Sequence, residues 1–471
     1  MSDTRRTKII ATLGPATNHP DTIARLLEAG VNVFRLNMSH ATHDQARTDT
    51  ENIRAIAEKS GRNVAVLMDT QGPAIRTGEL STELNLEPGQ VIALTVRGEQ
   101  SEEYTSVDVN YDDLVNDINV GDVVVVDNGT IKLKVLKKKR NQLECEVLTE
   151  GKLGSRRHIN LPGVRVNLPA LTDKDIADIE LGIEIGVDWF AMSFVRQPED
   201  VQRLRAILDY RKAPQKICAK LEDQQGVSNI DGIIKVADAV MIARGDLGIE
   251  IPFEDLPPLQ RKVVKRCLHH GRPVIVATHM LESMVNSPTP TRAEVTDVAN
   301  AVFEQADAIM LSGETSVGKY PLAAVEAMDR IARRIERSGG ANYARQAETH
   351  DVHAKIVRQA ADLANDLHAS ALVVFSRTGR MAHHAAWTRL LRARMFAFTN
   401  NPILLPQLNL LWGLIPIFLD FNERDPNQTV RDAANILLHR RLVESGSTVV
   451  FVTEAAIKDK TVDTIQVETL A

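Results

Sequence analysis

The sequence has few cysteines and few aromatic residues. Its three cysteines, Cys145, Cys218 and Cys267, are odd in number and widely spaced, so we expect neither a disulfide framework nor a CxxC pair. This cysteine usage fits a reducing compartment such as the cytoplasm. Aromatic residues make up only 4% of the chain, so a polar ligand is expected to contact charged side chains and backbone rather than aromatic rings.

No segment is typical of a targeting or membrane-spanning element. The N-terminal stretch MSDTRRTKIIATLG is basic at its start, but its apolar run is too short for a signal peptide. The longest nearly apolar stretch, residues 402–419, is interrupted by three prolines and a glycine, whereas a bilayer span needs about 20 consecutive apolar residues. We therefore expect a soluble, cytoplasmic protein with no membrane partner.

Charge and composition are those of an ordinary globular protein. The 471 residues include 56 Lys and Arg against 62 Asp and Glu, a net charge of −6, and 44% of them are apolar. At roughly 150 residues per domain, this length predicts about three domains. The slight acidity disfavours a nucleic-acid-binding scaffold, and we interpret the one basic run, residues 137–140, as a solvated hairpin turn. No nucleic-acid partner is expected.

Apolar runs of strand length alternate with helical segments along most of the chain. Three runs precede residue 72 and five more follow residue 187, which predicts eight β/α units and hence a (β/α)8 TIM barrel. A doubly wound open sheet is the alternative, but its first turn is usually rich in glycine, whereas the first turn here reads LGPAT. The expected strands are 8–13, 31–36, 64–69, 188–193, 216–221, 239–243, 273–278 and 307–312.

Two segments depart from this pattern. Between residues 72 and 168, β-branched stretches such as VIALTV and DVVVVDNG alternate with turn signals, which predicts an all-β insert after the third strand. After about Arg337, a helical linker leads to a second α/β block, with strands expected at 372–376, 395–399, 414–419 and 448–452. The predicted fold class is α/β, with a discontinuous barrel (1–72 and 170–340), a β-barrel-like insert (73–169) and a C-terminal α/β domain (341–471).

Polar residues collect at one end of the predicted barrel. The C-terminal strand ends and the loops after them form the active site in such barrels. Glu222 and Asp246 are carboxylates without Cys or His nearby, which suits a hard cation such as Mg²⁺ or Mn²⁺. Lys220, Arg35 and Arg76 are cations of the kind found around phosphate or carboxylate groups. The strand ends carry Arg35, Asn37, Ser39, Asp69, Thr70, Ser193, Lys220, Glu222, Arg244, Asp246, Thr278, Ser312 and Glu314.

The turn of residues 243–246 has features of an anion site. Gly245 lets the chain approach a ligand closely, so the turn can offer backbone N–H groups to an anion. We expect Arg244 to join Arg35, Arg76 and Lys220 at the barrel mouth, where these cations receive polyanions. The ordinary alternative is a turn without function, and RGD as a tripeptide carries no meaning in a cytosolic chain.

A second group of oxygen-bearing residues differs from the first. Asn37, Ser39, Asp69 and Thr70 supply one carboxylate among neutral oxygens, which suits a monovalent cation better than a divalent one. Ordinary explanations exist here too: Asp69 and Thr70 could form only a domain hinge, and a Lys-x-Glu pair at a strand end could be a surface ion pair of little energetic value. The predicted site therefore depends on the whole set of residues.

Nine motifs, in order, resemble those of the pyruvate kinase family over essentially the full length. The family has a barrel, a β-domain lid and a C-terminal α/β regulatory domain, in agreement with the predicted fold. The resemblance implies transfer of a phosphoryl group from phosphoenolpyruvate to ADP, which gives pyruvate and ATP in the last step of glycolysis. The motifs are TKIIATLGPAT (7–17), FRLNMSH (34–40), DTQGPAIRTG (69–78), INLPG (159–163), AKLED (219–223), ARGDLGIEIP (243–252), ATHMLESM (277–284), PTRAEVTDVANAV (290–302) and LSGET (311–315).

The resemblance also implies roles for individual residues. Glu222 and Asp246 would bind the Mg²⁺ or Mn²⁺ that contacts phosphoenolpyruvate, and Lys220 would stabilise the phosphoryl group in flight. No single residue is assigned as proton donor to the enolate. The implied sets are Arg35, Lys220, Gly245, Asp246 and Thr278 for the substrate; Asn37, Ser39, His40, Arg76 and Arg157 for the nucleotide; Asn37, Ser39, Asp69 and Thr70 for K⁺; and Lys220, Arg76, Thr278, Ser312 and Glu314 for catalysis.

Two departures from the family pattern bear on cofactors and nucleotide. Potassium-dependent members commonly have Glu, and potassium-independent members Lys, where this chain has Ala74. Thr70 and Thr77 resemble the dependent group and Gln71 the other, and we predict that K⁺ binds and activates. A lysine of the family's lid segment appears here as Arg157, which keeps the charge but changes the geometry.

Regulation and assembly are implied less directly. The segment FSRTGRMAHH (375–384) resembles the strand–loop–helix that binds an effector's phosphate, with Ser376, Arg377, Thr378, Gly379 and Arg380 as the loop, although an ordinary αβ turn fits equally well. The glycine-rich loop that completes a fructose-1,6-bisphosphate site is missing from residues 453–464. A sugar monophosphate, or no strong effector, is therefore favoured. Family members are usually tetramers, so a homotetramer is expected.

Two other functions stay open from the residues alone. A metal-dependent lyase or aldolase acting on pyruvate or phosphoenolpyruvate shares this kind of barrel, but it has no use for a β lid or for Arg76 on a nucleotide side. The second alternative is a catalytically inactive barrel that acts as a sugar-phosphate sensor. The joint presence of Lys220, Glu222 and Asp246 argues against it.

Overall fold

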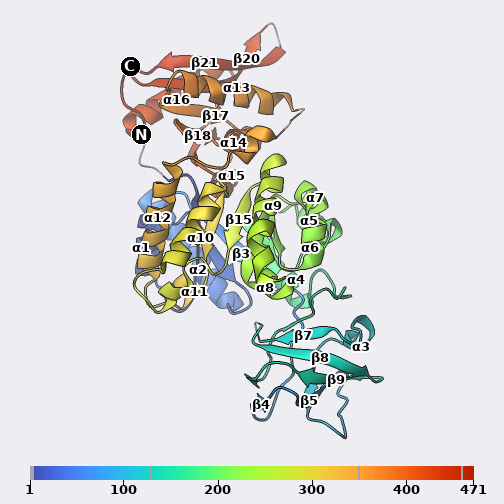
Figure 1. The fold of residues 1–471 in the computed structure, drawn as a ribbon. Helices are drawn as coiled ribbons and strands as arrows, with labels where there is room; N and C mark the ends of the chain where they lie inside the picture. The colour runs from blue at the N-terminus through green and yellow to red at the C-terminus, as the bar shows by residue number, and fades with distance from the viewer. Residues whose placement is uncertain (1–4, 128, 348, 350, 458–459) are drawn as a thin grey trace.

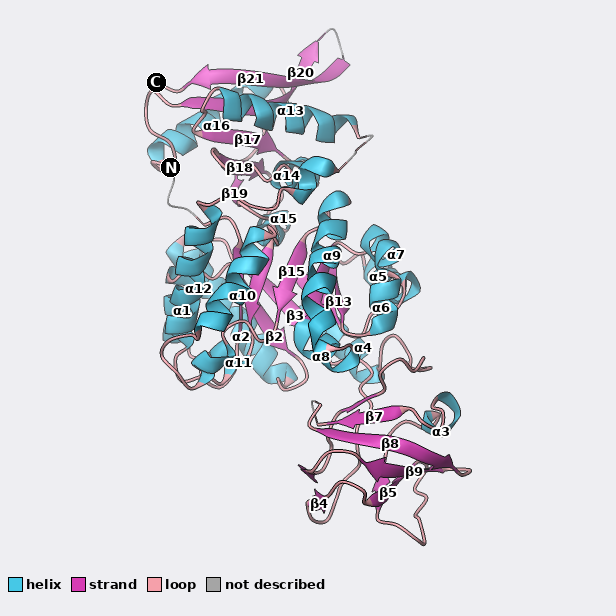
Figure 2. Ribbon diagram, in the orientation of Figure 1, coloured by secondary structure: helices cyan, strands magenta, loops and turns pink. Residues whose placement is uncertain are grey.

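The computed structural model describes residues 5–127, 129–347, 349, 351–457 and 460–471. Three parts follow one another along the molecule in Figure 1: a C-terminal α/β part, a central barrel and a β insert at the far end. Both connections of the insert to the barrel lie on the side away from the C-terminal part, and Figure 2 shows that the insert consists almost entirely of strands and loops.

Eight parallel strands close into a barrel in the order β1-β16-β15-β14-β13-β12-β3-β2. This confirms the predicted (β/α)8 barrel, and every expected strand is present with ends that differ by at most two residues. The strands are β1 (Lys8–Thr12), β2 (Val33–Asn37), β3 (Ala65–Asp69), β12 (Trp189–Met192), β13 (Lys216–Leu221), β14 (Ala239–Ala243), β15 (Val274–Ala277) and β16 (Ala308–Leu311).

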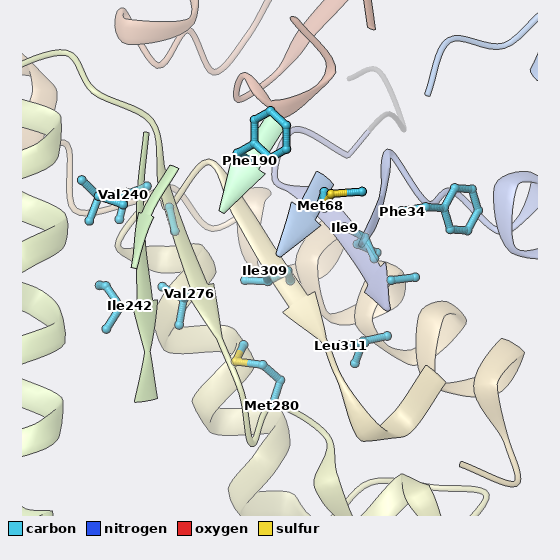
Figure 3. Packing of buried hydrophobic residues seen from close by; sticks show 14 of the residues in the cluster. Ile9, Phe34, Met68, Phe190, Val240, Ile242, Val276, Met280, Ile309 and Leu311 are labelled. Atoms are coloured by element: carbon cyan, nitrogen blue, oxygen red, sulfur yellow. The ribbon is translucent and has the colours of Figure 1, made fainter. Parts of the chain in front are cut away.

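The barrel strands are apolar on both faces because both faces are covered. Successive side chains point to opposite sides of a strand. On β3, Val66 and Met68 therefore pack under the surrounding helices, whereas Ala65 and Leu67 fill the barrel interior. Figure 3 shows part of the outer layer, to which several strands contribute one or two residues each. This packing leaves the strand ends as the place where polar groups are accessible.

Helices surround the barrel and connect its strands. Capping boxes begin several of them, for example Thr172 and Asp175 at α4, and Thr291 and Glu294 at α10. No helix among the described residues is long and apolar enough to span a bilayer. The helices are α1 (Pro20–Glu28), α2 (His43–Ser60), α4 (Asp173–Glu184), α5 (Pro198–Arg211), α6 (Gln224–Ser228), α7 (Ile230–Val236), α8 (Arg244–Glu250), α9 (Leu256–His269), α10 (Arg292–Phe303), α11 (Gly313–Ser316) and α12 (Pro321–Glu336).

The β insert lies between β3 and α4 and has a hydrophobic core of its own. It contains a six-stranded sheet in the order β11-β7-β8-β9-β5-β6 and a two-stranded sheet of β10 and β4. On β8 buried and exposed residues alternate, as expected for a strand with one solvated face. Its elements are β4 (Leu84–Leu86), β5 (Val91–Thr95), β6 (Ser106–Asp108), α3 (Leu114–Asp117), β7 (Val123–Val126), β8 (Ile131–Lys138), β9 (Gln142–Val147), β10 (Gly151–Leu153) and β11 (Ile159–Asn160).

The C-terminal part is a five-stranded sheet in the order β19-β18-β17-β20-β21 with helices on its faces. It packs on the N-terminal ends of the barrel strands, where Arg389 pairs with Asp307 at 2.5 Å and Leu410 joins the barrel interior. Its elements are β17 (Ala371–Phe375), β18 (Arg394–Thr399), β19 (Leu414–Phe418), β20 (Thr448–Ile457), β21 (Lys460–Thr469), α13 (Val352–Asp366), α14 (Arg380–Trp387), α15 (Leu404–Gln407) and α16 (Pro426–His439).

The last strand, β21, is absent from the predicted strands. The segment treated as a loop, residues 453–464, belongs to two antiparallel strands that pair from Thr448 with Thr469 up to Ile457 with Lys460. Residues 458–459 lie outside the described residues. The antiparallel partner supplies the backbone hydrogen bonds, so the segment forms strands although its own apolar pattern is weak.

Candidate active site

The polar cluster at the C-terminal end of the barrel is centred on the buried carboxylate of Asp69. This residue ends β3 and is fully buried. Nε of Arg35 donates to its Oδ2 at 2.6 Å, and Nζ of Lys220 lies 2.9 Å from its Oδ1. Burial alone would raise the pKa of Asp69, but these two cations hold it below its ordinary value. Asp69 therefore stays ionised and orients both cations.

Lys220 lies between two carboxylates. Its Nζ is 2.9 Å from Asp69 and 2.9 Å from Oε1 of Glu222, and it also donates to Oγ of Ser193 at 2.7 Å. Although burial opposes its charge, the two acids raise the pKa of Lys220 well above the ordinary value of lysine. The ammonium group is thus permanently charged and held at the barrel mouth by three side chains.

Ser193 is a member of this cluster to which sequence reasoning gave no role. Its Oγ donates to the carbonyl of Thr70 at 2.7 Å, lies 3.3 Å from Oδ1 of Asp69 and accepts from Lys220. The available signal was its position directly after strand β12 at the same end of the barrel. A serine is common enough in loops that this signal alone does not separate it from others.

Glu222 and Asp246 give the mouth an excess of negative charge. Burial raises the pKa of Glu222, and the nearby charge of Asp246 raises it further, although Lys220 partly offsets both. Counting Asp69, the cluster has three carboxylates against the two cations Arg35 and Lys220. That excess and the all-oxygen donor set fit a hard divalent cation. No group of three or more His, Cys, Asp or Glu within the described part of the chain is arranged to hold a metal.

The loop after β15 presents Thr278 to the start of α8. Thr278 and His279 both have positive φ, 64° and 53°, a strained conformation for residues with a side chain. Oγ1 of Thr278 accepts from the backbone N–H of Gly245 at 2.6 Å. A Cβ at Gly245 would come within 3.3 Å of that oxygen, so glycine allows this close approach.

The expectation for Arg244 is wrong. Its side chain is buried, and its guanidinium donates to the carbonyls of Thr278 and His279 and to Oδ1 of Asp297, the last at 2.7 Å. These acceptors lie in the protein, so the group is not presented to a ligand at the mouth. Its hydrogen bonds connect α8 to the strained loop of Thr278.

Glu314 and Ser312 occupy different environments although they are two residues apart. The Glu314 carboxylate accepts from the backbone N–H of Leu281 at 2.9 Å and of Ser312 at 2.7 Å, and burial raises its pKa. It therefore ties together the loops after β15 and β16. Oγ of Ser312 is buried and has no hydrogen-bond partner among the described residues.

The oxygen-bearing residues predicted for a monovalent cation come from two neighbouring strands. Asn37 and Asp69 are register partners at the ends of β2 and β3. Oδ1 of Asn37 accepts from the backbone N–H of Ser39 at 3.2 Å, and Oγ1 of Thr70 accepts from that of Ser193 at 3.2 Å. The tertiary structure thus brings these residues together, with one carboxylate among neutral oxygens.

The residues predicted for the nucleotide side are divided between barrel and insert. Arg76 forms an isolated bridge with His158 and donates to the carbonyl of Arg156 at 3.2 Å. Arg157 lies 3.3 Å from Oδ1 of Asp127, and His40, on the barrel side, is exposed. Burial lowers the pKa of His158, a residue not predicted, and the charge of Asp246 acts on it in the opposite direction. The segments that connect the insert to the barrel, around Arg76 and His158, therefore lie near the barrel mouth.

The predicted effector loop lines a cavity of about 350 Å³ in the C-terminal part. Ser376, Arg377, Thr378 and Arg380 belong to its wall. Gly379 has a φ of 92° at the N-terminal end of α14, a conformation that favours glycine. The guanidinium of Arg377 lies over the ring of Phe421, 5.5 Å from its centroid. Cations, hydroxyls and a helix N-terminus at one cavity are features of an anion site.

Comparison with known proteins shows similarity over most of the chain. The family described as "Pyruvate kinase, barrel domain" matches residues 4–325, and "Pyruvate kinase, alpha/beta domain" matches residues 354–468. Pyruvate kinase isozyme G, chloroplastic, of Nicotiana tabacum is 39% identical over 461 residues, which cover 97% of this chain and 81% of the relative. Pyruvate kinase of Sporosarcina psychrophila is 41% identical over 422 residues (88% and 72%), and that of Geobacillus stearothermophilus is 40% identical over 418 residues (87% and 71%).

Proposed function

The chain belongs to the pyruvate kinase family, and from this premise we propose how its own side chains carry out the family's reaction. It is a phosphotransferase of glycolysis that transfers the phosphoryl group of phosphoenolpyruvate to ADP and yields pyruvate and ATP. The observation that carries our proposal is the position of Lys220, whose ammonium group is buried between Asp69 and Glu222 at the open end of the barrel.

Lys220 and Arg35 act on the transferred phosphoryl group by charge. Phosphoryl transfer needs alignment of donor and acceptor and stabilisation of negative oxygens rather than covalent help from the protein. Both cations are oriented beforehand by Asp69, so little reorganisation is needed when the charge moves. Gly245, Asp246 and Thr278 would hold the rest of phosphoenolpyruvate through the turn at the start of α8.

We propose Glu222 and Asp246 as the protein ligands of Mg²⁺ or Mn²⁺. The excess of carboxylates at the mouth and their all-oxygen chemistry support this assignment. When bound, the divalent cation supplies charge neutralisation between substrate and nucleotide phosphates. Asn37, Ser39, Asp69 and Thr70 are proposed for K⁺, which we expect to bind and activate although Ala74 replaces the glutamate of potassium-dependent members.

Protonation of the enolate is proposed to proceed through water held by hydroxyl groups. Oγ of Ser312 has no partner in the described structure, and Thr278 lies on the neighbouring loop. Glu314 would contribute by fixing the backbone of both loops, because backbone N–H groups occupy its two oxygens. The proton therefore has no single assigned donor.

The nucleotide is proposed to bind between barrel and insert. Asn37, Ser39 and His40 would contact it from the barrel, and Arg76 and Arg157 from the insert, which would act as a lid. Arginine suits the phosphates of ADP because its planar group donates two parallel hydrogen bonds. The proposed division of the chain is a catalytic barrel (1–72 and 170–340), a β-barrel-like lid (73–169) and a regulatory α/β domain (341–471).

Regulation, assembly and location are each proposed from a single structural feature. The cavity at residues 376–380 would bind the phosphate of a sugar monophosphate, since the loop expected for a bisphosphate is replaced by β20 and β21. Val295 and Phe303 of α10 are exposed, which supports this helix as an interface of a homotetramer. The three cysteines are buried and unpaired, which supports a cytoplasmic location.

A coupled assay for pyruvate tests the proposed function. We expect pyruvate from phosphoenolpyruvate only when ADP and Mg²⁺ or Mn²⁺ are both present, with a higher rate in K⁺ than in buffer free of K⁺ and Na⁺. A sugar monophosphate such as glucose 6-phosphate should lower the KM for phosphoenolpyruvate, and fructose-1,6-bisphosphate should act more weakly. Pyruvate formation without ADP would instead indicate a lyase or phosphatase, and equal rates with and without K⁺ would refute the potassium assignment.

A further inference from the structure

One hydrogen bond connects the strands of the β insert to the barrel. Nδ2 of Asn160, the last residue of β11, donates to Oε1 of Glu250, the last residue of α8, at 2.9 Å. Over the residues that the structure describes, no other hydrogen bond or ion pair links strands β4 to β11 with a barrel residue. The insert's sheet is therefore tied to the barrel through this pair.

Both partners are shielded from water. Asn160 is 5% exposed and Glu250 is 8% exposed. Oδ1 of Asn160 finds no partner in the described part of the chain, so the amide is oriented by its Nδ2 bond to Glu250. A buried hydrogen bond to a carboxylate is stronger than an exposed one, because water does not compete for it.

The bond lies where both connections of the insert meet. The backbone N–H of Ile159, on β11, donates to the carbonyl of Ile75, in the segment that enters the insert. The segment that returns to the barrel begins directly after β11. A cavity of about 300 Å³ beside the bond is lined by residues of both parts, among them Leu161, Phe194 and Glu250. Arg196 of the barrel also donates to the carbonyls of Val166 and Leu168 in the returning segment, at 3.1 and 2.6 Å, so the bond of Asn160 is the one that acts on the sheet of the insert itself.

We infer that Asn160 is a positioning residue, which acts through Glu250 to set the orientation of the β insert relative to α8. The inference rests on the proposed function, in which Asp246 of α8 is a metal ligand and Arg76 and Arg157 of the insert contact ADP. Without the bond, the insert samples more orientations, and only some of them present its arginines to the nucleotide. Phosphoenolpyruvate is held by barrel residues, so its binding is expected to be unaffected.

Steady-state kinetics of Asn160→Ala test this role. We expect the KM for ADP to rise about 5- to 20-fold, the cost of one buried hydrogen bond, with the KM for phosphoenolpyruvate within about twofold of wild type. Glu250→Gln retains an oxygen that accepts from Asn160, so it should keep most of the ADP affinity, whereas Glu250→Ala should not. Asn229→Ala is the matched control, because Asn229 lines the same cavity but bonds within the barrel to the carbonyl of Arg196.

Distance measurements separate a positioning role from general damage. The native cysteines are buried, so spin labels can be placed at Lys134→Cys on the insert and Lys262→Cys on α9, both exposed positions. The interspin distance distribution should be broader in Asn160→Ala than in the unchanged background, with no loss of thermal stability of the barrel.

Two outcomes would overturn the inference: an unchanged distance distribution, or KM values for ADP and phosphoenolpyruvate that rise together. If the wild type forms no pyruvate with ADP, the proposed function fails, while the distance distributions still test the orientation of the insert. The two failures are therefore distinguishable.

Discussion

At the scale of single residues, burial turns common side chains into a reactive arrangement. A lysine near a glutamate on a surface contributes little, but Lys220 is enclosed by Asp69, Glu222 and Ser193. The same enclosure lets Asp69 orient two cations at once, Arg35 and Lys220. Arg244 has the opposite outcome: its charge faces carbonyls of its own chain and stabilises a loop.

Lys220→Met tests the charge at this position. We expect turnover to fall on the order of 10²–10³-fold or more, because a preorganised cation at the phosphoryl group is lost. The fold and Mn²⁺ binding should persist, since Glu222 and Asp246 are unchanged. Turnover is measured by the coupled assay, Mn²⁺ binding by electron paramagnetic resonance and folding by circular dichroism.

Lys216→Met is the matched control for that substitution. Lys216 begins the same strand, β13, at the opposite end of the barrel, where it lies 4.0 Å from Asp238. Its removal should leave turnover near that of wild type. Activity retained in folded Lys220→Met would refute the assigned role, and equal losses in both variants would indicate damage to β13 instead.

At the scale of elements, the short helix α8 carries three residues with different surroundings, which the motif ARGDLGIEIP alone does not distinguish. Its seven residues place Asp246 at the mouth, Arg244 under the loop of Thr278 and Glu250 against the insert. The buried side chain of Leu247 packs this short helix into the core, and Arg244 bonds it to the loop after β15. Changes in that loop are therefore expected to reach Asp246.

Arg244→Lys tests the link between α8 and the loop of Thr278. Lysine keeps the charge but lacks the planar group that reaches the carbonyls of Thr278 and His279 together. We expect kcat/KM for phosphoenolpyruvate to fall about 10- to 100-fold, because a displacement near 1 Å is enough to misplace the reacting groups. Steady-state kinetics measure this change.

The control is Arg261→Lys on α9. The Arg261 side chain is 59% exposed, and it pairs with Glu304 at 3.2 Å, so the same substitution should change kcat/KM little. A folded Arg244→Lys with the catalytic efficiency of the control would show that the strained loop does not need this guanidinium group.

At the scale of the whole molecule, the barrel has a different partner at each end. The C-terminal sheet covers the N-terminal strand ends, where Lys8 donates to the carbonyl of Leu414 at 2.7 Å. The β insert extends from the other end (Figure 1). An effector bound at residues 376–380 is therefore separated from the mouth by the length of the barrel, and its influence has to pass through the junction between barrel and C-terminal sheet.

His383 on α14 makes this junction sensitive to acid. Burial, together with the charges of Arg272 and Lys216, lowers the pKa of His383 to about 4, whereas an unfolded histidine has a pKa of about 6.5. As the pH falls below about 6.5, the unfolded chain takes up a proton that the folded protein does not, so stability is lost on acidification down to about pH 4. His383→Gln removes this titration.

Between pH 7 and pH 5, the wild type should lose about 1–2 kcal/mol more of its free energy of unfolding than His383→Gln. Denaturant unfolding at the two pH values measures the difference. His439→Gln, an exposed position at the end of α16, is the control and should follow the wild type. Parallel losses in all three proteins would show that His383 does not govern the acid response.

The sequence by itself determined the order of the elements and the kind of chemistry. Eight apolar runs, buried on both faces, predict a closed parallel barrel, and the polar residues that end them predict its active end, because parallel strands bring their C-terminal ends together. The β-strands of the insert and the motifs of residues 219–223 and 243–252 could also be predicted, because each depends only on a local pattern along the chain.

Only the tertiary structure decided which charged side chains lie at the barrel mouth and which bond to the backbone of the protein. Arg244 and Lys220 are both cations at strand ends, yet one bonds backbone carbonyls and the other lies between carboxylates. Ser193, Asn160 and Glu250 gain their importance from partners at least 27 residues away in sequence. Hydrogen bonds and charge interactions act over a few ångströms in space, whatever the separation of the residues along the chain. The partners of these residues therefore depend on how strands and loops meet in the folded protein.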